Sequence, residues 1–386
     1  MILMLASVTT RAEAEVAWAG GADIIDLKDP AKGALGALDA KVAANIVASI
    51  GKRSPVSAAA GSAFDDDGSL LDTVAAMAAT GVDYVKIGLA TNGRTAECLR
   101  ALASQARTTS LVGVLFADHA PDLSILQLMA DLGFKGAMLD TARKGDGRLL
   151  DHMGISALDR FIGLCRQFRL MAGLSGSLEA PDVPRLLPLE PDYLGFRGSL
   201  CQGRSREELI DLEAVKLIRD LIPRAVVSQV YEQGLDWRLL LGRGFVPAKE
   251  RLIETDLIFV HDLILPCAIG AYDFERGHTQ NVRFNIDAHV LRNESRLDDM
   301  RSVFSYDVII DSIKIILGRG HVDLIETLAS HIADEILRYP CVARVSVRIE
   351  KLEVVQGTVG VEIKRERAQG EAIEPASTRV YKGDAA

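Results

Sequence analysis

Short β-rich runs alternate with helical runs over about the first 240 residues, and this alternation limits the folds open to the chain. Amphipathic stretches such as 70–81 and 122–133 lie between the runs. Eight β-then-α units in this length predict a closed parallel (β/α)8 TIM barrel, an α/β fold. An open doubly wound sheet is the alternative, although no GxGxxG or GxxxxGK[ST] motif follows a strand. The expected strands are 2–8, 22–28, 55–61, 83–89, 110–117, 135–141, 169–176 and 193–198.

The pattern breaks at LLGRGFVPAKER, and another order of elements follows. Strand-like runs at 256–265 and 281–291 precede two helical runs, and two more strand-like runs close the segment. This ββααββ order predicts an α+β domain, with an antiparallel sheet and both helices on one face. The helices are expected at 304–317 and 323–338, and the last strands at 343–352 and 358–365. We therefore divide the chain into a barrel at 1–240, a linker at 241–252, a second domain at 253–370 and a flexible tail at 371–386.

Composition excludes several classes of protein. The net charge of −9 and the lack of a basic tract argue against nucleic-acid or anionic-lipid binding. Five scattered cysteines without a CxxC pair argue against a disulfide framework or zinc site, and the seven histidines show no metal-ligand spacing. No apolar run approaches the ~20 residues that span a bilayer. We expect a cytoplasmic protein that needs no metal or cofactor.

Charged residues lie inside several predicted strands, always with the same parity. Asp26 and Lys28 share one strand face with Ile24, because successive side chains point to opposite faces. The same parity places Lys86, Asp140 and Arg197 inside the predicted barrel, near the carboxyl ends of strands, where barrel active sites lie. Lys144 lies on the loop after Asp140 and could reach the same end of the barrel.

Two interior lysines indicate carbonyl chemistry. A deprotonated amine forms a Schiff base, and burial or a neighbouring cation lowers a lysine pKa. Carboxylates such as Asp26 and Asp140 could carry protons. GLSGS and GFRGS follow strands seven and eight, the usual phosphate site of such barrels. A lone Asp–Lys pair is more often a buried ion pair, and Gly–Ser loops are often plain turns, but the convergence of four charged groups favours catalysis. The predicted phosphate ligands are Gly173, Ser175, Gly176, Arg197, Gly198 and Arg204.

These stretches resemble the (5-formylfuran-3-yl)methyl phosphate synthase family over about residues 3–235. The resemblance rests on SVTTRAEAEVAWAGGADIIDLKDPAKGALGA, VDYVKIGL, MLDTARKGDGRLLDH and DYLGFRGSLC. It implies a barrel related to class I aldolases that joins two triose phosphates, with loss of phosphate and water, into the furan precursor of methanofuran-type carriers. It also implies Lys28 as the Schiff-base lysine and Lys86, Asp140 and Lys144 as its companions. Either Lys28 or Lys86 could be the nucleophile, and we prefer Lys28.

The second segment resembles dihydroneopterin aldolase over about residues 253–368. IGAYDFERGHTQ, DDMRSVFSYD and LIETLA carry the resemblance. Singly, their residues have ordinary explanations: Glu326 suits a helix N-terminus, Tyr306 a core, and Lys351 an edge strand. The family has the tunnelling fold (T-fold), whose subunits join edge to edge into a ring, so the resemblance implies a homo-oligomer formed through this domain. The family cleaves dihydroneopterin to hydroxymethyl-dihydropterin and glycolaldehyde without a metal or Schiff base.

By position, the resemblance implies that Glu326 binds the dihydropterin and that Lys351 organises proton removal with Glu275 beside it. Tyr306 would handle the product-side proton across a subunit boundary. The family usually has proline after this lysine, whereas Leu352 follows here. Our leading hypothesis is a bifunctional lyase of one-carbon carrier biosynthesis. The alternatives are an active barrel with a non-catalytic T-fold oligomerisation module, or a generic class I phosphosugar aldolase.

Overall fold

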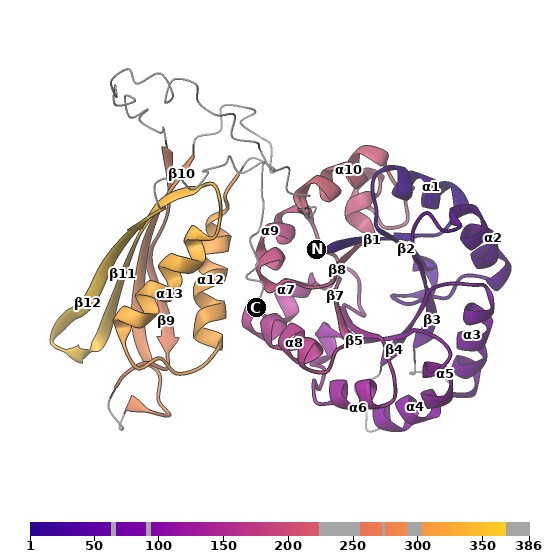
Figure 1. The fold of residues 1–386 in the computed structure, drawn as a ribbon, viewed down its shortest axis with the longest axis horizontal. Coiled ribbons are helices and arrows are strands. Elements are labelled where there is room, and N and C mark those ends of the chain that lie inside the picture. The colour runs from indigo at the N-terminus through magenta and orange to yellow at the C-terminus, as the bar shows by residue number, and fades with distance from the viewer. Residues whose placement is uncertain (63–66, 90–93, 224–254, 272–274, 292–302, 368–386) are drawn as a thin grey trace, which may run out of the picture. The chain divides into compact units, whose positions relative to one another are not determined.

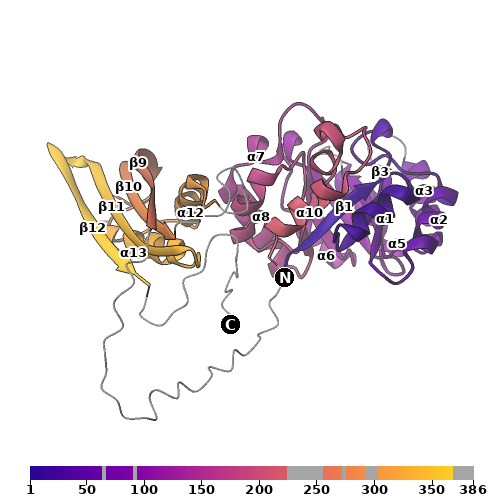
Figure 2. The ribbon, with the colours of Figure 1, turned by 90° about the horizontal axis from the view of Figure 1, so that it is seen from above.

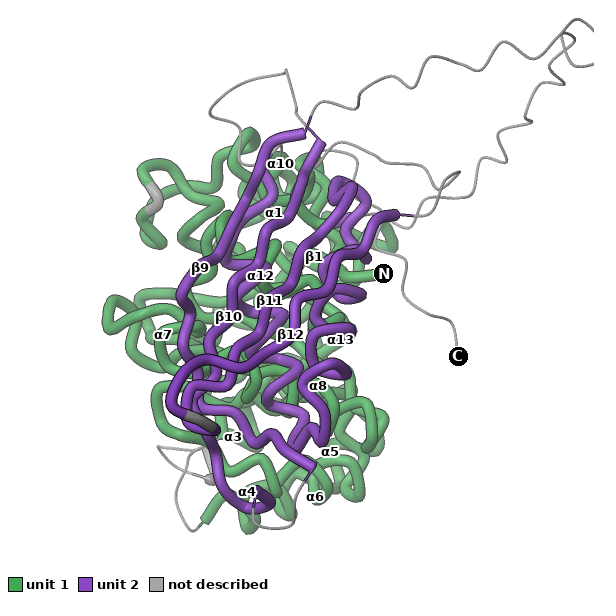
Figure 3. The backbone as a smooth tube through the Cα atoms, turned by 90° about the vertical axis from the view of Figure 1, so that its left-hand side faces the viewer, with its two compact units in different colours: residues 1–222 green, residues 223–386 purple. Residues whose placement is uncertain are grey.

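The computed structural model describes residues 1–62, 67–89, 94–223, 255–271, 275–291 and 303–367. The chain forms two compact units, Met1–Ile222 and Pro223–Ala386, coloured separately in Figure 3. The last described helix of the first unit ends at Leu221. The predicted linker at 241–252 and the predicted tail at 371–386 lie outside the described residues.

The first unit is the predicted (β/α)8 barrel. Its strands pair in sequence order, all in parallel, and β8 pairs with β1 to close the ring, as Figure 1 shows. All eight predicted strands are confirmed, with ends that move by at most two residues. The strands are β1 Leu3–Val8, β2 Ile24–Leu27, β3 Val56–Ser62, β4 Tyr84–Leu89, β5 Leu111–Phe116, β6 Gly136–Asp140, β7 Met171–Leu174 and β8 Tyr193–Phe196.

Helices surround this barrel in the ring seen in Figure 1. The helices predicted at 70–81 and 122–133 correspond to α3 and α6. The described helices of the unit are α1 Arg11–Ala19, α2 Ala40–Ile50, α3 Asp67–Ala79, α4 Thr95–Ala101, α5 Ala103–Ala106, α6 Ile125–Asp131, α7 Leu149–His152, α8 Ile155–Gln167, α9 Val183–Leu186 and α10 Leu212–Leu221.

Strand parity determines which side chains fill the barrel. An apolar cluster inside it contains Ile24, Met138 and Tyr193, with Tyr84 packed against them. Asp26, Lys86 and Asp140 are each two residues further along their strands and so point to the same side. In each of these three strands the charged residue therefore lies nearer the carboxyl end than the apolar residue two positions before it.

The second unit has the predicted ββααββ order. Its antiparallel sheet has the strand order β12-β11-β10-β9. Alternate β10 residues, including Phe284 and Ile286, are fully buried in a core with Leu328 and Ile332. Figure 2 shows both helices on one face of the sheet, as predicted. The elements are β9 Thr255–Cys267, β10 Gln280–Leu291, α12 Tyr306–Gly318, α13 Ile325–Leu337, β11 Val342–Val355 and β12 Gly357–Glu366. Among the described helices of both units, none has the length and hydropathy needed to cross a membrane.

Candidate active sites

Asp26 is the centre of a buried polar network in the barrel. It is fully buried, and its carboxylate accepts hydrogen bonds from Ser7 Oγ at 2.8 Å and Ser57 Oγ at 2.6 Å. Lys86 Nζ lies 2.7 Å from Asp26 Oδ1. Burial alone would raise the pKa of Asp26, but the positive charges of Lys86 and Lys28 and the hydrogen bonds hold that pKa below its usual value. Asp26 and Lys86 thus form a buried ion pair.

Asp140 and Lys144 form a second ion pair at the same end of the barrel. Lys144 Nζ lies 2.5 Å from Asp140 Oδ1 and donates a hydrogen bond to Thr141 Oγ1 at 3.0 Å. Asp140 is 2% exposed and terminates β6. Burial opposes its ionisation, but the charges of Lys144 and Lys28 outweigh burial and lower the pKa of Asp140. Lys144 therefore reaches the mouth from its loop, as the sequence predicted.

Lys28 directly follows β2 and has a different environment from Lys86. It is 5% exposed, and burial together with the charges of Lys144 and Lys86 lowers its pKa to about 8, although Asp140 and Asp26 act in the opposite direction. A lysine with this pKa has a useful fraction of neutral amine near neutral pH. Lys86 is instead bonded directly to the buried carboxylate of Asp26. The electrostatics therefore favour Lys28 over Lys86 as a nucleophile.

A cavity of about 370 Å³ opens beside Lys28 and Lys144. Of the predicted phosphate ligands, Ser175 and Gly198 line it, as does Arg197. Gly173 lies instead in a packing position, where an added Cβ would be 2.2 Å from Tyr193 Cζ. Gly176 packs against Thr141, and its carbonyl accepts a hydrogen bond from Leu149 N. The cavity lining is Lys28, Lys144, Gly145, Ser175, Ser177, Leu178, Glu179, Gly195, Arg197, Gly198, Ser199, Ser205 and Arg206.

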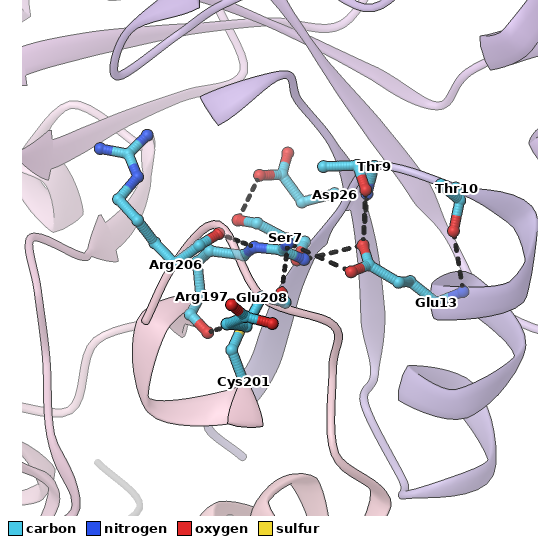
Figure 4. Close-up of polar contacts among 9 residues, drawn as sticks. All are labelled: Ser7, Thr9, Thr10, Glu13, Asp26, Arg197, Cys201, Arg206 and Glu208. Atoms are coloured by element: carbon cyan, nitrogen blue, oxygen red, sulfur yellow. Dashed lines mark hydrogen bonds and ion pairs between the residues drawn. The ribbon is translucent and has the colours of Figure 1, made fainter. Parts of the chain in front are cut away.

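Arg197 requires a correction, because its guanidinium is fully used by the protein. Its five N–H donors bind Glu13 at 2.8 and 3.1 Å and the backbone carbonyls of Ser7, Arg206 and Glu208, as Figure 4 shows. β8 ends at Phe196, and the backbone of Arg197 (φ −141°, ψ −71°) leaves the strand conformation. The two-residue alternation therefore ends before Arg197, which still borders the cavity but whose guanidinium binds protein groups through all its N–H donors. The side chain of Arg204, another predicted ligand, lies outside the described part of the structure.

Sequence reasoning missed Glu13, the buried partner of Arg197. Thr10 caps α1 by accepting a hydrogen bond from Glu13 N, and the Glu13 carboxylate accepts hydrogen bonds from Thr9 N and Oγ1. Burial would raise the pKa of Glu13, but Arg197 and Thr9 hold it below the ordinary value. The sequence TTRAE does show a capping pattern. That pattern explains the helix start, and it carries no information about a partner 184 residues away.

In the second unit, the structure brings together the predicted pair Lys351 and Glu275. Lys351 Nζ lies 3.1 Å from Glu275 Oε1, which also accepts a hydrogen bond from Gln280 Nε2 at 3.2 Å. Gly270 has a φ of +144°, and a Cβ there would be 2.0 Å from Glu275 Cδ, so glycine leaves room for this carboxylate. The pair is mostly buried, with 16% of the Lys351 side chain and 13% of the Glu275 side chain exposed.

The other two predicted residues lie at helix starts. Glu326 is exposed in the first turn of α13, and Tyr306 begins α12 with 59% of its surface exposed. Tyr306 is therefore a surface residue of this chain, not a core aromatic.

Two family models match the chain. The model described as 4-HFC-P synthase matches residues 4–219, which is more than half of the chain and runs from the second residue of β1 to beyond β8. The chain belongs to the 4-HFC-P synthase family. The model described as dihydroneopterin aldolase matches residues 258–364. The predicted fusion of a furan phosphate synthase-like barrel with a dihydroneopterin aldolase-like domain is confirmed. These matches identify the chain as an enzyme with lyase-type activity.

Individual relatives are similar to parts of the chain. A protein of Methylorubrum extorquens, provisionally named (5-formylfuran-3-yl)methyl phosphate synthase, is 43% identical over 209 residues, covering 54% of this chain and 86% of the relative. The (5-formylfuran-3-yl)methyl phosphate synthase of Methanococcus maripaludis strain C5 is 33% identical over 239 residues, covering 57% of this chain and 100% of the relative. A crystal structure of dihydroneopterin aldolase from Burkholderia thailendensis bound to guanine is 28% identical, covering 31% of this chain and 98% of that one, with a TM-score of 0.27.

Proposed function

We propose that the barrel condenses two molecules of glyceraldehyde 3-phosphate, through a Schiff base on Lys28, into the phosphate ester of a hydroxymethyl-furancarboxaldehyde. The observation that carries this proposal is a buried lysine with a pKa of about 8 beside two Asp–Lys ion pairs, with Lys28 and Lys144 lining one cavity. This product is a methanofuran precursor, and the matched relatives carry the name of such a synthase.

The environment of each charged residue determines its role in the proposed reaction. Neutral Lys28 attacks the carbonyl carbon of one triose phosphate, and loss of water gives an iminium ion that withdraws electrons from the neighbouring carbon. Asp140 and Lys144 exchange a proton at that carbon and at the departing oxygen, because they form one hydrogen-bonded pair at the cavity. The enamine carbon attacks the aldehyde carbon of the second triose phosphate. One phosphate and a net two water molecules leave as the furan ring forms, and hydrolysis of the Schiff base frees Lys28. Lys86 and Asp26 supply fixed charge and a proton route beneath Lys28.

Borohydride trapping tests the barrel proposal. The full chain is incubated with glyceraldehyde 3-phosphate and borohydride, and the labelled peptide is identified by mass spectrometry. We expect the label on Lys28, no label in Lys28→Ala, and a furan phosphate product when borohydride is omitted. A label on Lys86 would reassign the nucleophile. Trapping with only ordinary aldol products would instead support a generic class I phosphosugar aldolase.

For the second unit, we propose retro-aldol cleavage of dihydroneopterin to hydroxymethyl-dihydropterin and glycolaldehyde. The proposal is supported by the Lys351–Glu275 contact, which brings an ammonium group and a carboxylate within 3.1 Å of each other. In the proposed reaction this pair takes the proton of the substrate hydroxyl. Glu326 would bind the amino-pyrimidinone edge through two parallel N–H bonds, and Tyr306 would act on the product side from a neighbouring subunit.

Purified full chain supplied with dihydroneopterin, followed by chromatography, tests this second activity. We expect both products from the native chain and none from Lys351→Ala. Glu326→Ala should lose pterin binding while the assembly keeps its mass. A chain that forms furan phosphate yet never cleaves the pterin would leave the second unit as a non-catalytic oligomerisation module.

We also propose that the second unit forms a homo-oligomer. The sheet face opposite α12 and α13 exposes apolar β9 residues: Leu257 is 46%, Phe259 55% and Ile264 48% exposed. Phe259 pairs with Asp287, and Leu257 with His289, between the buried positions of β10. Covering this face in a ring would remove the apolar surface from water. Light scattering on the full chain measures the subunit number, and a monomer would refute the proposal.

A further inference from the structure

Arg197 and Arg206, both in the segment after β8, differ in how many of their N–H donors the protein uses. Arg197 forms an ion pair with Glu13, and all of its N–H donors form hydrogen bonds within the protein. Arg206 donates hydrogen bonds from Nη2 to the carbonyls of Pro30 at 3.2 Å and Gly33 at 3.3 Å. No carboxylate of the described residues forms an ion pair with it, and its Nε and Nη1 donate to none of those residues. Arg206 therefore has no direct ion-pair partner among the described residues, although Asp140 and Glu207 act on it electrostatically, and it keeps Nε and Nη1 as donors for an anion.

Arg206 also lies beside the reacting groups. It lines the same cavity as Lys28 and Lys144. Its side chain is partly buried, and that burial lowers the pKa of its guanidinium, against the nearby negative charge of Asp140. A guanidinium remains charged despite such a shift, because its ordinary pKa lies far above neutral pH. A partly dehydrated cation at the mouth of a cavity gains more from an anionic ligand than an exposed one does.

The surrounding residues are suited to phosphate oxygens. Ser199 lines the cavity, and its hydroxyl oxygen has no hydrogen-bond partner among the residues that the structure describes. Ser175, Ser177 and Ser205 also line the cavity and contribute hydroxyl groups. Glu179 is the acidic residue in this lining. The set is therefore mostly hydroxyl groups and cations, the groups that bind phosphate.

The position of Arg206 is fixed by the network in Figure 4. Its backbone carbonyl accepts a hydrogen bond from Arg197 Nε at 3.0 Å, and Figure 4 shows its guanidinium turned away from the Arg197–Glu13 pair. Its side chain in turn holds residues 30–33, which begin two residues after Lys28. Arg206 thus connects the last strand-to-helix loop of the barrel with the loop that carries the candidate nucleophile.

We propose that Arg206 binds the phosphate group of the triose phosphate whose carbonyl reacts with Lys28. The proposal rests on the Schiff-base function proposed for the barrel. Arg206 makes a bidentate, charge-assisted contact through Nε and Nη1, and Ser199 turns its hydroxyl towards the same phosphate. Arg197 and Glu13 are positioning residues, which act through the backbone of Arg206 without touching the substrate.

Two measurements on the full chain test this assignment. The first is the binding of inorganic phosphate by calorimetry to the native chain, Arg206→Gln and the matched control Arg166→Gln, which removes an exposed arginine from α8. We expect Arg206→Gln to weaken phosphate binding by about 10–100-fold, the usual cost of losing a charge-assisted contact, and Arg166→Gln to have no effect. Equal binding by the native chain and Arg206→Gln, or no binding by the native chain, would overturn the proposal.

The second measurement compares borohydride trapping of glyceraldehyde 3-phosphate with trapping of glyceraldehyde, which lacks the phosphate. Arg206→Gln should raise the half-saturating concentration of the phosphorylated aldehyde by about 10–100-fold and leave trapping of glyceraldehyde within about twofold. Equal loss for both aldehydes would show that Arg206 only holds the loop, and would refute phosphate binding. Arg206-dependent phosphate binding without any trapping would instead refute the Schiff-base function and preserve the anion site.

Discussion

The lowered pKa of Lys28 gives the sharpest prediction, because the charged residues that cause it can be removed one at a time by mutation. With a pKa of about 8 in place of 10.5, about one amine in ten is neutral at pH 7, against about one in three thousand for an ordinary lysine. The nucleophile concentration therefore rises by about 300-fold. Lys144 contributes to the lowered pKa, whereas Asp140 acts against it. Lys144→Gln should raise the pKa of Lys28, and Asp140→Asn should lower it, each by on the order of one pH unit.

Competitive acetylation measures these values without any substrate. Small amounts of acetic anhydride react with neutral amines between pH 6 and 11, and mass spectrometry follows the peptide carrying Lys28. Lys41, which is exposed at the start of α2, serves as an internal reference for the reagent. We expect a midpoint near 8 in the native chain and shifts of opposite sign in the two variants. A native midpoint near 10, or shifts of the same sign, would refute the electrostatic reasoning about this site.

The other predictions concern the remaining charged pairs. Glu13→Gln leaves the buried Arg197 without its carboxylate and should destabilise the barrel by about 3–5 kcal/mol in urea unfolding, whereas Glu15→Gln, at an exposed pair with Arg53, should leave the midpoint nearly unchanged. Folding lowers the pKa of Glu13 below 4.5, so the stability that its charge contributes is complete above that pH. This contribution is lost as the pH falls through the lower, folded-state pKa. The difference in unfolding free energy between the native chain and Glu13→Gln should therefore disappear in acid. Asp140→Asn should reduce furan phosphate formation by about 10²–10⁴-fold at unchanged secondary structure by circular dichroism. Glu275→Gln should reduce dihydroneopterin cleavage by about 10²–10⁴-fold and leave furan phosphate formation unaltered, which a chromatographic assay of both products in one sample can check.

The sequence was most informative where the backbone is regular. Period-two alternation in the strands placed Asp26, Lys86 and Asp140 in one interior, and the structure confirms that they lie there. The order of the elements likewise predicted the closed barrel and the ββααββ unit. Both results follow from hydrophobic periodicity, which acts locally and can be read from one chain.

The sequence was least informative immediately beyond strand ends. Arg197 follows β8 by one residue, and its backbone has already turned the guanidinium towards Glu13. Arg206 lies in a segment of short turns without periodicity, so nothing in its neighbours indicates that it reaches the carbonyls of Pro30 and Gly33. Contacts between segments this far apart depend on how the barrel closes, which local patterns do not specify.

The ion pair between Glu13 and Arg197 has a consequence for the order of events during synthesis. It joins residues 184 positions apart, across the seam where β8 pairs with β1. While the ribosome is still making the middle strands, Glu13 has no partner and β1 is an open edge. Closure must wait for residues 193–208, and these precede every residue of the second unit. The barrel can therefore be complete before the second sheet exists, and any assembly made by that sheet joins barrels that have already folded.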